Sequence, residues 1–341
     1  MIRRLTLLSF LVISSLLAEA QQDGYQTHFA FNQMSFNPAF AGRNRDFLCF
    51  TALYHQQYLG FKNTEQNQIS PQWSIPSNNI APVTQFFSIA APIKRFGIGV
   101  NVIQDKISVL NSTNIKLNAS YRFDMGSGSI TPGISAGFMQ KAIDGTRLKP
   151  LNPGDPSVPS ARETDGKPDF GFGLMYENLN LNNLYIGYSA THLKSANFQT
   201  NASIDFTTMK MHHYLVAGID YPLGDGSIVL QPAILIKSAN LSTYQFDMSA
   251  VAWFNNKFWG GVSYRDGDNV NAMVGFNAID KPKQSMKVGY SYDFTLNALR
   301  DFSNNGSTGS HELYISYCFK INIKTKDNFY YRLTPRYLQK M

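Results

Sequence analysis

Apolar and polar residues alternate one by one along several segments of this chain. In NIKLNASYRF the apolar positions are Ile115, Leu117, Ala119, Tyr121 and Phe123, and the residues between them are polar. The same period of two runs through TYQFDMSAVAWF, SMKVGYSYDF and ELYISYCF, and the helical period fits none of these segments. Alternation over about ten residues is typical of the strands of a transmembrane β-barrel, which turn one face to lipid and the other to the lumen.

Following this pattern along the chain predicts fourteen strands. They lie near residues 47–58, 83–93, 96–105, 113–123, 128–141, 168–177, 182–192, 211–221, 226–238, 243–254, 257–265, 269–279, 284–294 and 311–320.

The predicted connections between these strands alternate in length. Tight turns lie near 92–95, 124–127, 177–181, 222–225, 255–256 and 279–283. Longer loops cover 59–82, 106–112, 142–167, 193–210 and 295–310, with two short ones near Ala239 and Gly267. Short periplasmic turns, long extracellular loops and an even strand number are typical of outer-membrane barrels. We therefore predict an all-β fold, a transmembrane antiparallel up-and-down β-barrel of 14 strands, over a soluble sandwich, whose outward faces would carry more charge.

The polar faces of the predicted strands contain charges of both signs. In contact with lipid each charge would cost about 2–4 kcal/mol at mid-depth, so we expect these side chains to point into the lumen. They are Lys116, Arg122, Lys237, Gln245, Asp247, Arg265, Lys287, Asp293 and Glu312. We expect a salt-linked network that plugs the lumen rather than a selective ion path, but the strand number does not decide whether a pore is open.

Composition and the N-terminus indicate an exported membrane protein. Aromatic residues make up 13% of the chain and charged residues 16%, whereas soluble domains average about 25% charged residues. Arg3 and Arg4, an apolar run at 5–17 and a small-x-small site at 18–20 predict a cleaved signal peptide, residues 1–20. The apolar run is shorter than the roughly 20 residues of a spanning helix, which disfavours a retained anchor.

We divide the mature chain into three parts. These are a periplasmic N-terminal segment at 21–46, the barrel at 47–320 and a basic periplasmic tail at 321–341. Loss of Arg3, Arg4 and Glu19 with the signal peptide leaves 28 Lys and Arg against 22 Asp and Glu. This mildly basic charge is too diffuse to indicate nucleic acid as a partner.

The two cysteines, Cys49 and Cys318, fall on the first and last predicted strands, which meet where a barrel closes. We favour two buried, unbridged thiols, because free cysteine behaves as a small hydrophobic residue. A disulfide is the alternative.

No pattern in the chain indicates catalysis, a metal or a cofactor, so we predict none of the three. His212 and His213 are the only adjacent histidines, and neighbours on a strand point to opposite faces, so they cannot bind one metal ion together. His311 and Glu312 have no matching serine in a G-x-S-x-G motif, which disfavours a barrel hydrolase.

Two segments outside the predicted strands have unusual compositions. Residues 151–170, LNPGDPSVPSARETDGKPDF, are rich in proline and predict a long extracellular loop. This loop is either a stiffened surface element or a docking surface for a secreted partner. The tail KINIKTKDNFYYRLTPRYLQKM mixes basic with aromatic residues, which are uncommon in disordered tails. We favour a periplasmic peptide that folds onto a partner over a disordered tail.

The segment FNQMSFNPAFAGR, residues 31–43, is too interrupted to cross a bilayer and too apolar for a solvated leader. Asn37 precedes a proline and therefore favours an extended or turn conformation, and Gly42 permits backbone angles that other residues resist. The phenylalanines near it must be buried away from lipid. We expect the segment to pack in or under the periplasmic opening of the barrel as a partial plug.

Short motifs follow one another along the chain and together resemble those of a known family. NPAFAG at 37–42 resembles an opening N-P-A-[YF]-A-G signature, and HQQYLGF at 55–61 resembles [RH]-x-Q-[WY]-x-G-F. VIQDKIS at 102–108 is similar to an N-D-x-I-G-like element, from which Gln104 and Ser108 depart. These motifs belong to the PorP/SprF family of type IX secretion system outer-membrane proteins.

The resemblance continues to the end of the predicted barrel and covers nearly the whole mature chain. WGGVSYR at 259–265 and VGYSYDF at 288–294 are similar to later strand motifs of the family. SHELYISYCF at 310–319 resembles its closing strand. The resemblance implies a barrel in the outer membrane of a Bacteroidota-type bacterium, in contact with outer-membrane lipid.

The resemblance also implies partners in the type IX secretion machinery. They are a secreted cargo protein, held through its C-terminal domain, and the PorK- and PorN-like proteins of the periplasmic ring. SprF-like members each serve one cargo, often a large cell-surface adhesin of gliding motility with a type B C-terminal domain. PorP-like members serve many cargoes, and the sequence does not separate the two subtypes.

We therefore predict an interaction protein that binds or escorts a type IX cargo at the outer membrane and docks to the ring. The candidate partner-binding residues lie in the first two motifs and the tail: Asn37, Pro38, Ala39, Gly42, His55, Gln57, Gly60, Arg332, Pro335 and Arg336. The motif residues among them could equally serve barrel closure. The alternative function is an outer-membrane channel for small solutes, which the polar lumen suggests.

Overall fold

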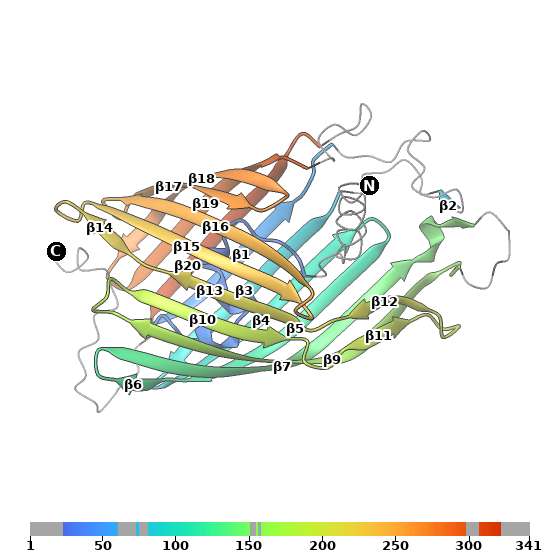
Figure 1. The fold of residues 1–341 in the computed structure, drawn as a ribbon, viewed down its shortest axis with the longest axis horizontal. Helices are drawn as coiled ribbons and strands as arrows, with labels where there is room; N and C mark the ends of the chain where they lie inside the picture. Colours follow the sequence, from blue (N-terminus) through green and yellow to red (C-terminus); the bar gives the residue numbers. More distant parts are fainter. Residues whose placement is uncertain are drawn as a thin grey trace, which may run out of the picture.

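A computed structural model describes residues 23–60, 73–74, 81–150, 155, 158–297 and 307–321. In this part the chain forms a closed antiparallel β-barrel in which successive strands pair with each other (Figure 1). The barrel closes where β1 (Phe47–Gln56) pairs with β20 (Ser310–Lys320). The predicted all-β barrel fold is confirmed.

Twelve further strands complete the wall between β1 and β20. They are β3 (Val83–Ile93), β4 (Phe96–Ile107), β5 (Leu110–Tyr121), β7 (Gly128–Asp144), β9 (Arg162–Asn178), β10 (Leu184–Thr191), β13 (His212–Gly218), β15 (Ile228–Ala239), β16 (Thr243–Phe254), β17 (Phe258–Arg265), β18 (Asn269–Lys281) and β19 (Gln284–Thr295). The short strands β6 (Phe123–Met125) and β14 (Tyr221–Leu223) extend β5 and β13 beyond a break. The wall therefore has the fourteen strands that the alternation predicted.

The connections differ from the prediction where the strands extend past the alternating pattern. The predicted loop at 106–112 is a two-residue turn at Ser108 and Val109, because β4 and β5 stay paired up to Ile107 and Leu110. The predicted loop at 193–210 contains a hairpin of β11 (Ala196–Gln199) and β12 (Asp205–Met209). The sequence pattern missed these extensions because their residues do not keep the apolar–polar alternation.

The proline-rich segment is also only partly a loop, because β9 already begins at Arg162 and pairs there with Asp144 at the end of β7. Before it lie the 3-10 turn η4 (Gly145–Arg147) and β8 (Lys149–Pro150), which pairs with β2 (Trp73–Ser74). The remainder of the predicted loops at 59–82, 151–157 and 295–310 lies mostly outside the described residues.

The two faces of the wall have the predicted chemistry. Large apolar side chains such as Leu117, which is 62% exposed, cover the outside of the barrel. Polar side chains on the alternate positions are buried in the lumen. Ion pairs join them, among which Lys116 Nζ lies 3.3 Å from Asp169 Oδ2 and Lys237 Nζ lies 2.7 Å from Asp247 Oδ2. The expected salt-linked lumen is confirmed.

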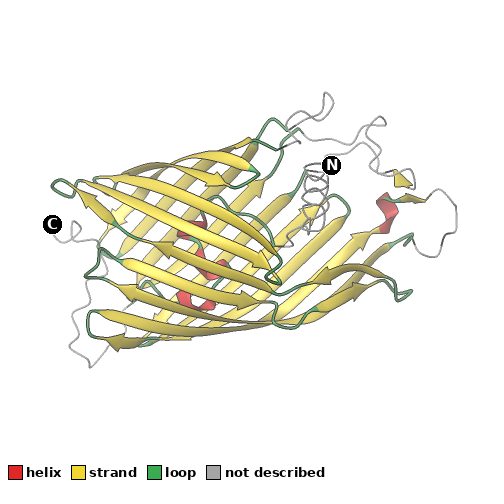
Figure 2. Cartoon of the chain, in the orientation of Figure 1, coloured by secondary structure: helices red, strands yellow, loops and turns green. Residues whose placement is uncertain are grey.

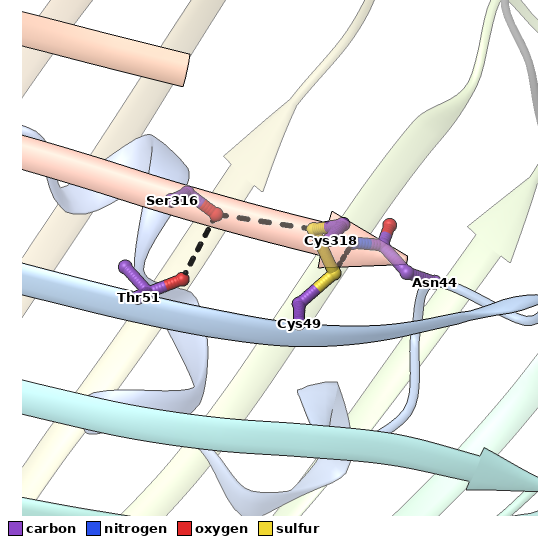
Figure 3. The surroundings of a disulfide bond; sticks show 5 residues. All are labelled: Asn44, Cys49, Thr51, Ser316 and Cys318. Atoms are coloured by element: carbon purple, nitrogen blue, oxygen red, sulfur yellow. Dashed lines mark hydrogen bonds between the residues drawn. A yellow bond between two sulfur atoms is a disulfide. The ribbon is translucent and has the colours of Figure 1, made fainter. Parts of the chain in front are cut away.

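Cys49 and Cys318 form a disulfide across the seam where the barrel closes (Figure 3). The prediction of two unbridged thiols was wrong, because it considered the burial of each thiol and not the register of the closing strands. In that register the two cysteines are directly opposite each other on β1 and β20. Two residues further along the same strands, the hydroxyls of Thr51 and Ser316 are 3.2 Å apart.

Before β1 the chain runs inside the barrel as three 3-10 turns, η1 (Phe29–Phe31), η2 (Gln33–Ser35) and η3 (Pro38–Phe40). Figure 2 shows these turns within the half of the barrel nearer β6 and β14. Across the described ranges, no helix is long and apolar enough to cross a membrane. The predicted signal peptide, 1–20, and all but Ile321 of the predicted tail lie outside the described residues.

Candidate functional site: the luminal segment and its seat in the barrel

Residues 23–43, which we call the luminal segment, are enclosed by the barrel wall. Phe29, Ala39 and Asn37 are at most 1% exposed, so the core of the segment has no solvent contact. Hydrogen bonds, ring contacts and close backbone approaches join it to strands all around the barrel: β1, β4, β5, β7, β9, β10, β13, β17 and β20. The luminal segment therefore lies across the lumen and contacts opposite sides of the wall.

Glu312 of β20 holds the start of this segment. Its Oε2 accepts a hydrogen bond from the backbone N–H of Thr27 at 2.9 Å, and its Oε1 accepts one from the N–H of His28 at 2.8 Å. The Nδ1 of His28 also lies 2.5 Å from Oε1. Glu312 is fully buried, and an enclosed carboxylate is tolerated only when such donors satisfy it.

Asp293 of β19 and His55 of β1 extend this polar cluster. The hydroxyl of Thr27 donates to Asp293 Oδ2 at 2.9 Å, and His55 Nε2 lies 3.3 Å from the same oxygen. His55 Nδ1 donates to the carbonyl oxygen of Tyr25 at 3.0 Å, since a carbonyl can only accept. Three strands next to the seam thus bind residues 25–28 of the luminal segment.

Arg265 of β17 contacts the same part of the segment. Its guanidinium lies 4.6 Å from the ring centre of Tyr25, and its Nε donates to Asp247 Oδ1 at 2.9 Å. Burial of Tyr25 raises the pKa of its hydroxyl to about 12, although the charge of Arg265 acts in the opposite direction. The Tyr25 hydroxyl therefore stays protonated at neutral pH and adds no negative charge to the lumen.

Aromatic rings pack around the first 3-10 turn. The ring of Phe31 lies 5.0 Å from Trp259 and 5.3 Å from Tyr314, centroid to centroid. Two glycines of the wall make room for Trp259, because a Cβ at Gly275 or Gly289 would lie 2.2 or 2.5 Å from the indole. The indole, and with it the aromatic cluster, can occupy this site only while both positions are glycine.

The NPAFAG motif is seated on glycines of the opposite wall. Asn37 caps η3 by accepting from Ala39 N at 2.9 Å, and its Nδ2 donates to the carbonyl of Tyr188 at 3.2 Å. A Cβ at Gly173 would lie 2.0 Å from Asn37 Oδ1, and one at Gly133 would lie 2.5 Å from Ala39 N. The motif therefore rests directly on β7 through its backbone and on β9 through the side chains of Asn37 and Pro38.

The end of the motif is fixed in the same way. A Cβ at Gly97 would lie 1.9 Å from the carbonyl oxygen of Ala41, which accepts from Ser120 Oγ at 2.8 Å. Gly42 has a φ of 65° and its Cα faces Gly97, so this position requires glycine for conformation and for space. Arg43 then donates to Glu177 Oε1 at 2.8 Å and stacks 4.3 Å from the Tyr185 ring centre.

The structure places the predicted site residues in two groups. Asn37, Pro38, Ala39 and Gly42 are buried against β7, β9 and β4, whereas His55 reaches the opposite end of the luminal segment at the seam. Their partner-binding role stays a prediction.

The other predicted residues lie outside these contacts. Gln57 is buried beyond the end of β1, where its N–H donates to the carbonyl of Pro82 at 2.9 Å, and Gly60 has a φ of 86°. Arg332, Pro335 and Arg336 lie outside the described residues.

The sequence did not identify the residues of the wall that hold the luminal segment. Arg265, Asp293 and Glu312 are the polar positions of the three late motifs, and all three contact residues 25–28. The sequence indicated that these three residues face the lumen, but it did not indicate that all three contact the luminal segment.

The fold and lumen define an outer-membrane β-barrel protein. Its sequence matches the family described as type IX secretion system membrane protein PorP/SprF over residues 18–317, and the chain belongs to this family. The family resemblance of the motifs is thereby confirmed, and membership implies association with components of this secretion system.

Solved structures of similar fold have low sequence identity to this chain. The CymD monoaromatic hydrocarbon channel is 13% identical with a TM-score of 0.49, covering 85% of this chain and 92% of that chain. The Ralstonia pickettii toluene transporter TbuX is 11% identical with a TM-score of 0.49, covering 84% and 93%. A Pseudomonas aeruginosa FadL homologue is 10% identical with a TM-score of 0.48, covering 87% and 95%. No protein of curated function matches the chain.

Proposed function

We propose that this barrel is the outer-membrane component of the type IX system that binds or escorts a cargo through its C-terminal domain and docks to the periplasmic ring. The family membership over residues 18–317 carries this proposal. The luminal segment, which is packed inside the barrel, supports a closed barrel over the alternative, an open channel for small solutes.

The energetics of the lumen favour this closed state. To open a path, the segment would have to leave Glu312, Asp293 and Glu177, which bind it through buried or partly buried hydrogen bonds. Hydrogen bonds to charged groups contribute about 1.5–3 kcal/mol each, and each of these carboxylates would lose part of its hydrogen bonding in the lumen. Spontaneous opening is therefore rare.

The extended side of the barrel offers a surface for cargo. β7 and β9 have 17 residues each, whereas a membrane-spanning strand needs about 9–11, so they project beyond the bilayer. The β11–β12 hairpin packs on this projection through Phe198, which is fully buried with Met139 and Met209. An ordered projection of this kind is suited to hold a protein domain.

Site-specific photo-crosslinking in the native bacterium tests this function. A photoreactive residue at the exposed Ser195, beside the β11–β12 hairpin, is expected to crosslink to the C-terminal domain of a secreted cargo. The same residue at Leu117, on the lipid face, is the matched control and should capture no cargo. Purified barrel should show no steady conductance in planar bilayers. Absence of cargo adducts at Ser195 together with a steady open current would favour the solute channel.

A further inference from the structure

His192 and His212 converge inside the barrel with Asp23 of the luminal segment. One ligand atom from each residue lies within 4.8 Å of the other two. His192 follows β10 directly and His212 begins β13, and these strands are paired so that Thr191 is opposite His212. Both imidazoles are 2% exposed.

Each imidazole is oriented by a hydrogen bond from its other nitrogen. His192 Nδ1 lies 2.9 Å from Asp169 Oδ1, and His212 Nδ1 lies 2.9 Å from the carbonyl oxygen of Lys210. A carbonyl accepts only, so the Nδ1 of His212 carries the proton and its Nε2 presents a lone pair. Metal-binding histidines are held in this way by a carboxylate or carbonyl behind the ring.

The inward-facing nitrogens of the two imidazoles differ in their partners. His212 Nε2 is buried and has no hydrogen-bond partner among the described residues. His192 Nε2 lies 3.0 Å from Asp23 Oδ1, and the Tyr214 hydroxyl donates to the other oxygen of Asp23. An orphaned buried lone pair is costly, and a bound cation would satisfy it.

We propose that Asp23, His192 and His212 bind a divalent transition-metal ion, zinc being the best fit to the donor set, and that the ion fastens the luminal segment to the barrel wall. Two imidazoles and one carboxylate, with a fourth position left for water, form a common zinc ligand set. Ligand atoms about 2.0 Å from a tetrahedral ion lie about 3.3 Å apart. The present spacing of 3.0 Å for one pair and at most 4.8 Å for the others needs only small side-chain rotations.

Charge and access are consistent with a cation. The carboxylate of Asp23 faces the site and that of Asp169 lies behind the His192 ring, and Lys116, 3.3 Å from Asp169 Oδ2, balances only one of these two charges. A cavity of about 50 Å³ borders Asp23, Lys116 and Tyr214, so there is space for solvent beside the site. The ion would make the position of residue 23 depend on metal as well as on hydrogen bonds.

The chain offers a matched control for this site. His213 is the neighbour of His212 on β13 and points to the outside, where its Nδ1 lies 2.8 Å from the Tyr188 hydroxyl. The sequence prediction that His212 and His213 cannot share an ion holds, but the partner of His212 comes from the adjacent strand.

Zinc titration of the purified full-length barrel in detergent, after chelator treatment, tests the proposal. Wild type and His213→Ala are expected to bind one Zn²⁺ per chain, and Co²⁺ should give the visible absorption of a tetrahedral site. His212→Ala and Asp23→Asn are expected to weaken Zn²⁺ binding at least tenfold. Heat-modifiable gel mobility checks that each variant is folded. If His212→Ala fails to assemble, Asp23→Asn still tests the site, because it leaves the residues of the wall unchanged.

Limited trypsin digestion tests whether the metal ion fastens the luminal segment to the barrel wall. Zinc should slow tryptic cleavage after Arg43 in wild type and in His213→Ala, and should have no effect in Asp23→Asn. No zinc binding by wild type, or equal binding by Asp23→Asn, would overturn the site. Equal cleavage with and without zinc in wild type would overturn the fastening. Both assays use the isolated barrel, so their outcome is independent of the proposed cargo function.

Discussion

The Nδ1 of His28 lies 2.5 Å from Oε1 of Glu312, and both side chains are fully enclosed. This contact joins the luminal segment to the last strand of the barrel, 284 residues later in the sequence. The seam that closes the barrel is therefore also the place where the luminal segment is held, so assembly of the wall and insertion of the segment are coupled.

Replacing Glu312 with alanine should release the luminal segment. The change removes the acceptor of two backbone N–H groups and the partner of His28, and breaking a buried pair in this way costs about 3–5 kcal/mol. Trypsin should then cut after Arg43 and Arg45 in the assembled barrel faster than in wild type, which mass spectrometry detects. Glu163→Gln, at the projecting end of β9, is the control and should be cut at the wild-type rate. A wild-type cleavage rate in Glu312→Ala would show that Glu312 does not anchor the segment.

NPAFAG packs directly against glycines of the wall, so methyl groups added at these positions should displace it. In Gly97→Ala the new Cβ would lie 1.9 Å from the carbonyl oxygen of Ala41, and overpacking of this kind costs about 1–3 kcal/mol. We expect a lower midpoint in urea unfolding of the lipid-embedded barrel. Gly260→Ala is the matched control, because the nearest atom to its Cβ is 3.6 Å away. Equal midpoints for the two variants would contradict the seat.

The disulfide predicts a difference between oxidised and reduced chains. Cys49 and Cys318 close a loop with a sequence separation of 269, and loss of such a link destabilises a fold by about 3–5 kcal/mol. Boiled wild type should migrate faster without reductant than with it, and Cys49→Ser should migrate alike in both conditions. A thiol titration that finds free cysteines in the unreduced protein would contradict the bridge.

A charge on the outer face should impair insertion according to its depth. Leu117 lies in the middle of β5 and is 62% exposed, and lysine at mid-bilayer costs about 2–4 kcal/mol. We expect less folded Leu117→Lys protein in refolding into vesicles, measured as the heat-modifiable fraction. Leu181→Lys, in the turn between β9 and β10, should refold like wild type. Equal yields would indicate that the face of Leu117 does not meet lipid.

Much of the wall could be predicted from the sequence. The alternation around Ile115 and Leu117 separates the lipid face from the lumen face, since side chains on a strand point to opposite sides. For β16 the predicted bounds, 243–254, agree with the structure. Beyond Asp105 the alternation ends although β4 and β5 stay paired up to Ile107 and Leu110, so the prediction of a loop at 106–112 failed.

The candidate site was far less predictable, as His55 illustrates. Its position on the lumen face of the strand follows from the two-residue alternation. Its contacts with Tyr25 and Asp293 depend on barrel closure and on where the luminal segment enters. The disulfide was missed for the same reason, because only the register of β1 against β20 places the two sulfurs opposite each other.

The sequence by itself determined the kind of fold: strands in number and position, an outer face for lipid and an inner face for charge. Local alternation suffices for this, because whether a strand position must be apolar or polar depends on whether it faces lipid or the lumen, independently of the neighbouring strands. Only the tertiary structure decided which lumen residues meet, including the seat of NPAFAG on Gly97 and Gly133 and the meeting of His192 with His212. These contacts join residues distant in sequence, and they are fixed by strand register, closure of the barrel and the close packing of its interior.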